Sequence, residues 1–348
     1  MAKHTHTSKS PAASATIVIV GGESLLGKEV REVLEMRAVP AKIQLLATLE
    51  EGKVISGQHG ELGVMDTLRA EDLMAAKVVI LAGSPESSRR AYQLATAAKG
   101  QPVPPFIDLS GGLEDNPQAR LRAPMAEPAP TPAGPLSLVA HPAASVLALF
   151  LRRLQSITPI RRCVVHIFEP ASERGQTGLD ELQQQTVGLL SFQKLNKEVF
   201  DAQASFNMLP KFGEDAPRSL EDIEMTIDRH LASLLSATGP SPVHVPMPSL
   251  RVAQAPVFHG YSFSVWVEFE RNPNIPALAK ALAADPIEVR TKDQEPPSNA
   301  GIAGQSGVTA GAFQVDRNDP KAGWFWLVAD NLRIAAEQAV EVARGFVR

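Results

Sequence analysis

The residues best placed to bind a ligand form a glycine-containing turn near the start of the chain. Segment 21–27 has the sequence GGESLLG and directly follows a short run of β-branched apolar residues. Such a turn brings backbone N–H groups to a pyrophosphate at the first turn of a helix. Ser24 stands where a dinucleotide-binding turn usually has its middle glycine. Glu23 adds a carboxylate that competes with a phosphate for the same amides. The residues expected to bind a nucleotide are Gly21, Gly22, Ser24, Leu25, Leu26, Gly27, Thr48 and Gly83.

Two interpretations of this turn stay open. The first is a dinucleotide site, and the second is a plain strand-to-helix turn with an acidic first helical turn, in which case no cofactor binds. Segment 48–51, TLEE, follows the second apolar run, where a dinucleotide-binding domain selects the ribose. Two carboxylates without an arginine would repel a 2′-phosphate, so a bound nucleotide would be NAD rather than NADP. A solvated acidic turn is the alternative here.

A second turn, 141–145 with the sequence HPAAS, lies where a nucleophile would face the ligand crevice. Ala143 and Ala144 are chemically inert, and we expect Ser145 to cap the following helix because no base is identifiable near it. The single cysteine, Cys163, lies inside an apolar strand, where a thiol is usually inert packing. One cysteine also excludes a disulfide framework and a cysteine-based metal site, and we expect no metal.

These turns need strands and helices that hold them at one edge of a sheet. Short apolar runs alternate with helical periodicity through the first 150 residues or so, which predicts a Rossmann-type parallel sheet with its crevice at the carboxyl ends of the strands. The predicted strands are 16–20, 42–47, 78–84, 106–112 and 136–140.

The pattern changes in the second half of the chain. Longer alternating strands with helices set to one side predict an α+β domain whose exposed sheet face pairs with a copy of itself. The predicted strands are 163–168, 250–257 and 261–271, and the predicted helices are 179–190 and 219–235. The glycine-rich segment 298–311 is expected to be flexible, and a strand at 323–328 precedes a helix at 330–347.

The chain is long enough for two domains, and its composition limits the classes of partner. We expect a disordered tail (1–15), a Rossmann-type domain (16–145), an α+β dimerisation domain (146–322), and a strand and helix (323–348) packing on the first domain. The net charge is −4, which argues against a nucleic acid partner. No apolar run is long enough to span a membrane, and the low cysteine content suits a reducing cytoplasm.

Several longer motifs together resemble the aspartate-β-semialdehyde dehydrogenase family over essentially the whole chain after the tail. The matching runs are IVIVGGESLLGKEV, FIDLSGGLED, AHPAAS, FEPASERG, FNMLP, QAPVFHGYSFSVWVEFE and VADNLRIAAEQAVEVA. The last three are most similar to the Usg-type paralogue, a branch of that family. The resemblance implies a Rossmann domain joined to an α+β dimerisation domain. It also implies a reaction in which a cysteine thiolate attacks an aldehyde, a hydride passes to NADP, and phosphate displaces the acyl group.

When the family's functional residues are carried over one by one, their roles fall on side chains that are unsuited to that chemistry. The nucleophilic cysteine falls on Ala144, and the glutamine of the next motif falls on Glu169. The arginine that binds the substrate carboxylate falls on Gln254, and the acid/base histidine falls on Tyr261. Without a thiolate no covalent intermediate forms, and glutamine lacks the fixed charge that arginine offers a carboxylate.

The phosphate-binding positions of the family also change. The arginine after the DLSG-type turn falls on Glu114 and the lysine of the acidic helix falls on Glu224, while Asp228 keeps a carboxylate. Each charge reversal would cost a bound phosphate roughly 1–4 kcal/mol even at high effective dielectric. We therefore expect the family reaction to be lost.

Two classes of function follow from these observations. The first is a dimeric protein that resembles aspartate-semialdehyde dehydrogenase and lacks the phosphorylating activity, as a homodimer or with a related dehydrogenase subunit. The second is an NAD-dependent oxidoreductase that acts on a different aldehyde or oxo substrate through His141, Glu169 or His259.

Overall fold

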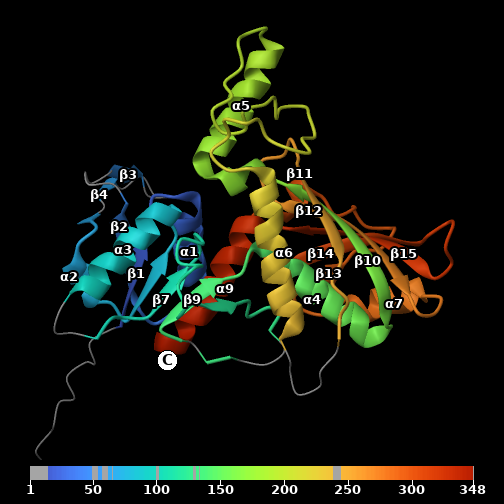
Figure 1. Cartoon of the computed structure of the whole chain (residues 1–348), viewed down its shortest axis with the longest axis horizontal. Coiled ribbons are helices and arrows are strands. Elements are labelled where there is room, and N and C mark those ends of the chain that lie inside the picture. Colours follow the sequence, from blue (N-terminus) through green and yellow to red (C-terminus); the bar gives the residue numbers. More distant parts are fainter. Residues whose placement is uncertain are drawn as a thin grey trace, which may run out of the picture.

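The computed structural model describes residues 15–48, 54–56, 62–64, 66–98, 102–127, 131–132, 134–237 and 244–347 (Figure 1). The expected disordered tail lies outside the described residues except for Ala15. Three of the four residues of the expected ribose-selecting turn, 49–51, also lie outside them.

The first domain is built on a seven-stranded sheet in which every pair of neighbouring strands is parallel. Its order is β5-β2-β1-β6-β7-β9-β8, so the chain reverses direction across the sheet next to β1, which places a crevice at the carboxyl ends of β1 and β6. The strands are β1 (Thr16–Val20), β2 (Lys42–Ala47), β5 (Asp66–Thr67), β6 (Val78–Leu81), β7 (Phe106–Asp108), β8 (Arg120–Arg122) and β9 (Leu136–Val139). A separate pair joins β3 (Val54–Ser56) to β4 (Leu62–Val64).

Helices cover both faces of this sheet because its strands are apolar on both sides. Helices α1 (Leu25–Met36) and α9 (Asn331–Val347) pack on the face that carries Ile17 and Ile19. Helices α2 (Ala70–Met74) and α3 (Pro85–Ala97) pack on the face that carries Val18 and Val20. The expected return of the final helix to the first domain is confirmed, and an ion pair from Arg333 to Glu29 at 2.7 Å fixes α9 on α1.

The second domain is a six-stranded mixed sheet with helices on one face (Figure 1). Its order is β11-β10-β12-β15-β14-β13. The strands are β10 (Ile160–Glu169), β11 (Ser249–Gln254), β12 (Tyr261–Phe269), β13 (Ile287–Val289), β14 (Val308–Val315) and β15 (Ala322–Ala329). The helices are α4 (Pro142–Ile157), the 3₁₀ turn η1 (Ala171–Arg174), α5 (Gly175–Leu190), α6 (Leu220–Ser236), α7 (Ile275–Leu282) and α8 (Asn299–Ile302). Helices α4, α6 and α7 form the main core with the inner face of the sheet.

Two expectations for the carboxyl-terminal third are wrong. The strand at 323–328 does not pack on the first domain, because β15 lies between β12 and β14 in the second sheet. Segment 298–311 is not a flexible stretch, because it holds α8 and the start of β14, where Val308 and Ala310 are buried. Glycine content suggested flexibility here, whereas two of these glycines, Gly304 and Gly307, adopt positive φ in the turn between α8 and β14.

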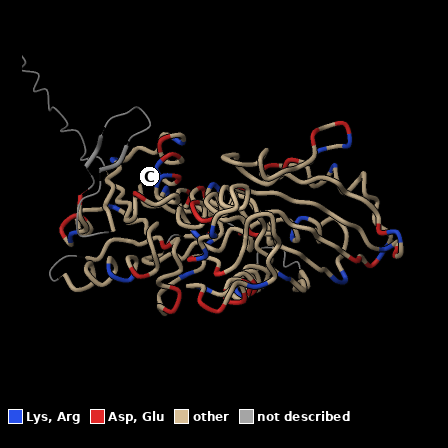
Figure 2. The backbone as a smooth tube through the Cα atoms, turned by 90° about the horizontal axis from the view of Figure 1, so that it is seen from above, with Lys and Arg blue, Asp and Glu red and all other residues tan. Residues whose placement is uncertain are grey.

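The outer face of the second sheet carries half-buried aromatic side chains. Pairing across the strands aligns Val164 with Trp266 and Trp266 with Trp324, while Trp326 lies one row further along. These are the three tryptophans of the chain, and Phe168 stacks on Trp326 at a ring-centroid distance of 5.8 Å. Figure 2 shows acidic and basic residues interspersed along the described backbone. In the part of the chain that the structure describes, no helix is both long and apolar enough to cross a bilayer.

Candidate functional site

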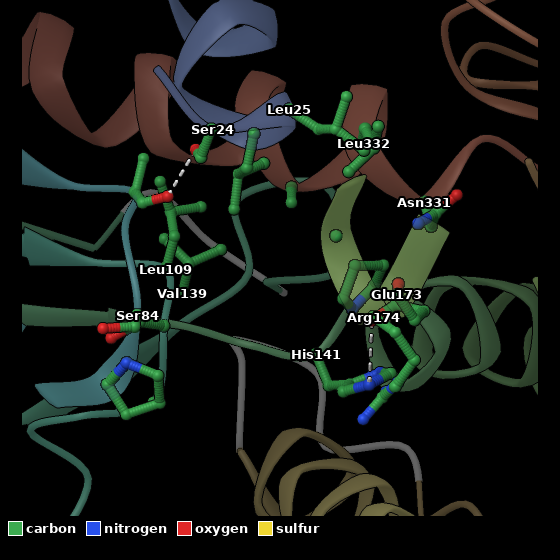
Figure 3. A pocket seen from close by; sticks show the side chains of 18 of the residues that line it. Ser24, Leu25, Ser84, Leu109, Val139, His141, Glu173, Arg174, Asn331 and Leu332 are labelled. Atoms are coloured by element: carbon green, nitrogen blue, oxygen red, sulfur yellow. Dashed lines mark hydrogen bonds and ion pairs between the residues drawn. The ribbon is translucent and has the colours of Figure 1, made fainter. Parts of the chain in front are cut away.

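A cavity of about 690 Å³ lies between the two domains at the carboxyl ends of the first sheet's strands. Figure 3 shows Ser24, Leu25 and Ser84 at one end, and His141, Glu173 and Arg174 at the other. The first domain contributes segments 24–26, 82–85, 109–111, 139–142 and Glu114; the second contributes 172–175, 217–218, Thr226 and His230; α9 contributes 331–332 and Ala335. The cavity therefore joins the expected nucleotide turn to a group of ionisable side chains.

Glycine is required where the first turn approaches neighbouring backbone. Gly21 has φ +82°, and a Cβ added there would lie 2.5 Å from Cα of Gly83. A Cβ on Gly27 would lie 2.1 Å from the carbonyl oxygen of Gly21. Both contacts are too short for any side chain, so these glycines serve the close packing of strand and helix.

The expected nucleotide residues divide into two groups. Ser24, Leu25, Leu26 and Gly83 line the cavity, whereas the other four lie outside the lining. Ser24 caps α1: its Oγ accepts from the N–H of Gly27 at 2.8 Å and donates to the carbonyl of Ala82 at 2.7 Å. The residues outside the lining are Gly21, Gly22, Gly27 and Thr48.

The carboxylate of Glu23 is held by Thr48, whereas the sequence suggested that it would lie near the amides that bind a phosphate. The backbone N–H and the hydroxyl of Thr48 donate to Glu23 Oε1, at 3.0 and 2.5 Å. Glu23 is also absent from the cavity lining. Because its charge is held by Thr48, we no longer expect Glu23 to compete with a ligand for the amides of α1.

His141 caps helix α4, which is the role that we expected for Ser145. Its Nδ1 accepts from the N–H of Ala143 at 3.3 Å, so the proton of the neutral ring lies on Nε2. Nε2 is 3.9 Å from Oε2 of Glu173. Burial lowers the pKa of His141 well below its ordinary value and keeps the ring neutral. Ser145 lies inside α4 and accepts from Gln338 at 3.1 Å.

A second histidine continues this network towards Glu114. The backbone N–H of His141 donates to Nδ1 of His230 at 3.0 Å, so His230 Nε2 carries a proton and donates to Glu114 Oε1 at 2.9 Å. Arg229 also contacts that carboxylate, at 2.7 Å. The hydrogen bond from His230 is the main cause that lowers the pKa of Glu114, and it holds the side chain as a carboxylate.

A buried ion pair joins Arg174 of the cavity lining to Glu169 behind it. Arg174 Nη2 donates to Glu169 Oε1 at 2.9 Å, and the side chain of Glu169 is 0% exposed. The hydroxyl of Tyr261 donates to the second oxygen of Glu169 at 3.4 Å. Burial raises the pKa of Glu169 against the opposing effect of Arg174, and burial raises that of Tyr261 well above its ordinary value.

Glu173 lies beside this pair and faces the cavity. Burial and the nearby charge of Glu169 raise its pKa to about 7, while Arg174 and Asn331 oppose the rise. The side chain is 15% exposed. Glu173 therefore changes charge near neutral pH and is a candidate to gain or lose a proton in the cavity.

Arg218 supplies a second guanidinium at the same end. It lies just before α6 and donates to the hydroxyl of Thr226 at 3.2 Å. Among the described residues, no carboxylate lies within ion-pair distance of its guanidinium.

The four catalytic and substrate-binding positions carried over from the family lie around the cavity and do not line it. Ala144 is fully buried in α4. Gln254 is also buried, with Nε2 donating to the carbonyls of Glu169 and Ala255 at 2.9 Å. Tyr261 and Glu169 lie behind Arg174. These side chains support the wall of the cavity and leave its lining to other residues.

The remaining sequence-based candidates are scattered. Of the two family phosphate positions, Glu114 lines the cavity and Glu224 does not, because Glu224 accepts from the N–H of Val252 at 2.8 Å. Asp228 is exposed, and the half-buried His259 is not part of the lining. His141 and Glu169 were both candidates for an altered chemistry, and the carboxylate that lies next to His141 is that of Glu173. Within the described ranges, no group of three or more His, Cys, Asp or Glu side chains is arranged to hold a metal ion.

Several polar and charged residues that line the cavity were not predicted from the sequence. Glu173 and Arg174 lie in the motif FEPASERG, where two opposite charges next to a glycine were a usable signal. Arg218 precedes α6 and His230 lies within it, and neither gave a local pattern, because only the fold brings them to the first domain. The residues missed are Glu173, Arg174, Arg218, His230 and Asn331.

The chain is similar to one group of known proteins over its whole length. Residues 151–334 match the family described as semialdehyde dehydrogenase, dimerisation domain. A USG-1 protein homolog from Azotobacter vinelandii is 28% identical over 97% of this chain and 99% of that protein. An aspartate-semialdehyde dehydrogenase from Rickettsia bellii is 28% identical over 58% of this chain and 59% of that protein. A solved structure of a probable aspartate-semialdehyde dehydrogenase from Pseudomonas aeruginosa has a TM-score of 0.80 at 25% identity, covering 95% of this chain and 98% of that one.

Proposed function

The chain belongs to the semialdehyde dehydrogenase family, and from this premise we propose that it is a dimeric, ligand-binding member without the family's thiol-dependent reaction. The resemblance that the sequence indicated is thereby confirmed. The observation that carries the proposal is Ala144, which takes the place of the nucleophilic cysteine and is fully buried at the start of α4.

No other thiol replaces the missing nucleophile. Cys163 is the only cysteine and is buried in β10, on the inner face of the second sheet. Burial raises the pKa of Cys163 to about 12, so a thiolate is not formed at neutral pH. A covalent acyl intermediate therefore has no residue on which to form.

The nucleotide end of the cavity supports weak binding of NAD. The turn keeps the glycines that allow close backbone approach, and Ser24 places its capped helix end at the cavity. The carboxylate of Glu23 is turned to Thr48 and is not part of the cavity lining. The two glutamates of segment 48–51 favour NAD over NADP, and this preference remains a proposal because they lie outside the described residues.

The outer face of the second sheet is the proposed dimer interface. Its three half-buried tryptophans form an aromatic patch of the kind that a partner subunit covers, with Asp316 accepting from the indole N–H groups of Trp266 and Trp324. The matched dimerisation domain includes both strands that carry this patch. A homodimer is the proposed assembly, and pairing with a related dehydrogenase subunit would use the same face.

The test combines an activity assay with nucleotide binding. We expect no phosphate-dependent oxidation of aspartate semialdehyde with NADP or NAD above a no-enzyme control, and no gain from Ala144→Cys, because Gln254 and Tyr261 remain. Turnover by the unaltered protein would contradict the proposal. Calorimetry should give NAD the tighter affinity, and tighter NADP binding would overturn the assignment of the ribose turn.

One observation favours a second function, oxidoreduction without a thiol. The neutral His141 ring presents Nε2–H to the cavity beside Glu173, and Glu173 changes charge near neutral pH. We propose that these two groups, 3.9 Å apart, exchange protons with a substrate bound between them while an alcohol and a carbonyl interconvert next to a nicotinamide. Substrate-dependent NAD reduction that is lost in Glu173→Gln, with the fold retained, would support this function over the first.

A further inference from the structure

The end of the cavity away from the nucleotide turn is rich in hydrogen-bond donors. Arg174 and the Nε2–H of His141 lie there (Figure 3). Arg218 and Thr226 also line the cavity, and the guanidinium of Arg218 donates to the hydroxyl of Thr226. Arg174 is 10% exposed and gives one nitrogen to Glu169, while its Nε has no hydrogen-bond partner among the described residues although it is buried. A buried guanidinium with unused donors favours an acceptor from outside the chain.

The net charge at this end depends on the protonation of Glu173 when every ion pair is taken into account. Arg229 is paired with Glu114, and Arg174 with Glu169. Arg218 and Glu173 remain, and no ion pair joins them among the described residues. When Glu173 takes up a proton, the charge of Arg218 makes this end of the cavity positive, which favours binding of an anion.

A carboxylate fits this arrangement better than a phosphate. The planar guanidinium fork binds both groups, so its geometry alone does not choose between them. Glu114 lines the same end as a carboxylate, and its partner Arg229 is mostly exposed, so Glu114 would repel a phosphate group with two charges more strongly than a carboxylate group with one. Glu173 itself lies among Arg174, His141 and Asn331, which indicates that these groups tolerate a carboxyl group.

We propose that this end of the cavity binds a small organic acid, with its carboxylate between Arg174 and Arg218 and with Glu173 taking up a proton as the acid binds. The inference deepens the proposed ligand-binding function and requires no bound nucleotide. The step is balanced, because the proton comes from solvent and no bond to carbon changes.

The surroundings of Glu173 give the direction of the pH dependence. The side chain of Glu173 faces Glu169 on β10, His141 before α4 and Tyr261 on β12. It also faces Asn331 on α9 and Arg218 before α6. An arriving negative charge further disfavours ionised Glu173, so its pKa rises in the complex. Affinity should therefore be highest below pH 7 and fall above it, by at most about tenfold per pH unit for one proton.

The experiment titrates succinate into the full-length protein by calorimetry at pH 6.5, 7.5 and 8.5, without nucleotide. We expect saturable binding that weakens about tenfold across this range. Glu173→Gln should remove the pH dependence and bind more tightly than the unaltered protein at pH 8.5. Arg218→Gln should weaken binding about tenfold through loss of a charge-assisted hydrogen bond. Arg271→Gln removes the same charge at an exposed position outside the cavity and should leave binding unchanged.

Several results would overturn the inference. These are no saturable succinate binding, an Arg218→Gln variant that binds like the unaltered protein, or a pH dependence that survives Glu173→Gln. Tighter binding of inorganic phosphate than of succinate would overturn the choice of a carboxylate. NAD is titrated into the same samples, so that retained succinate binding without NAD binding refutes only the nucleotide part of the proposed function.

Discussion

Glu173→Gln should make the protein more stable, and the gain should grow as the pH rises. The folded state raises the pKa of Glu173 from 4.5 to about 7, chiefly through burial and the charge of Glu169. A group whose pKa is raised by folding stabilises the folded state below its unfolded pKa, and this stability is lost as the pH rises through the folded value. The unaltered protein therefore loses the stability contributed by neutral Glu173 between about pH 4.5 and pH 7.

The size of the effect follows from the two pKa values. One unit of pKa corresponds to about 1.4 kcal/mol, so ionised Glu173 costs the folded state about 3 kcal/mol at pH 8.5 and about 1 kcal/mol at pH 5. Glutamine has nearly the same shape and stays neutral. The stability difference between Glu173→Gln and the unaltered protein should grow by about 2 kcal/mol over this range. For a chain of this length, that is about 3 °C in Tm.

Thermal unfolding at pH 5 and pH 8.5 measures this difference directly. Glu214→Gln, at an exposed position, is the control for the loss of one negative charge. A Tm difference that stays constant between the two pH values would refute the reasoning, and so would a variant less stable than the unaltered protein at pH 8.5. Either result would mean that Glu173 is ionised without cost in the folded state.

Two further predictions concern the interface and the buried ion pair. Trp324→Glu places a charge in the tryptophan patch and should prevent the proposed dimerisation, so that light scattering gives a monomer, whereas a dimeric variant would exclude this face. Arg174→Met leaves Glu169 buried without its cation and should cost about 3 kcal/mol in unfolding free energy, the lower end of the usual range because burial already favours neutral Glu169. Adding Glu169→Gln should recover part of that loss, and no recovery would mean that the two charges are not coupled.

Much of the fold could be predicted because its signals are local. Buried parallel strands show as short apolar runs, and helices show as apolar residues at helical spacing. The prediction that segment 298–311 is flexible was wrong because glycine content indicates backbone freedom. The buried Val308 and Ala310 are too few to show the alternating pattern of a strand. The domain predicted for β15 was wrong because a sequence pattern indicates that a strand forms, but not which strands it pairs with.

The candidate site was only partly predictable, because it is assembled from distant segments. The glycine turn and His141 carry local signals at strand ends, and both adjoin the cavity. Arg218 and His230 come from the second domain, and no spacing along the chain connects them to His141. The sequence also could not show that Thr48 holds the carboxylate of Glu23, since that contact depends on two neighbouring strands.

The substitutions around Ala144 are connected to each other through the buried ion pair. In the carried-over family positions, an arginine gives way to Gln254 and a glutamine gives way to Glu169. Gln254 donates to the backbone carbonyl of Glu169, while Arg174 neutralises the carboxylate, so the two replacements and Arg174 form one hydrogen-bonded unit. A guanidinium bound to Glu169 attracts a ligand less than a free one does. Among the described residues that line the cavity, Arg218 is then the cation without an ion-pair partner, and its exposed position makes it the most direct residue to test by substitution.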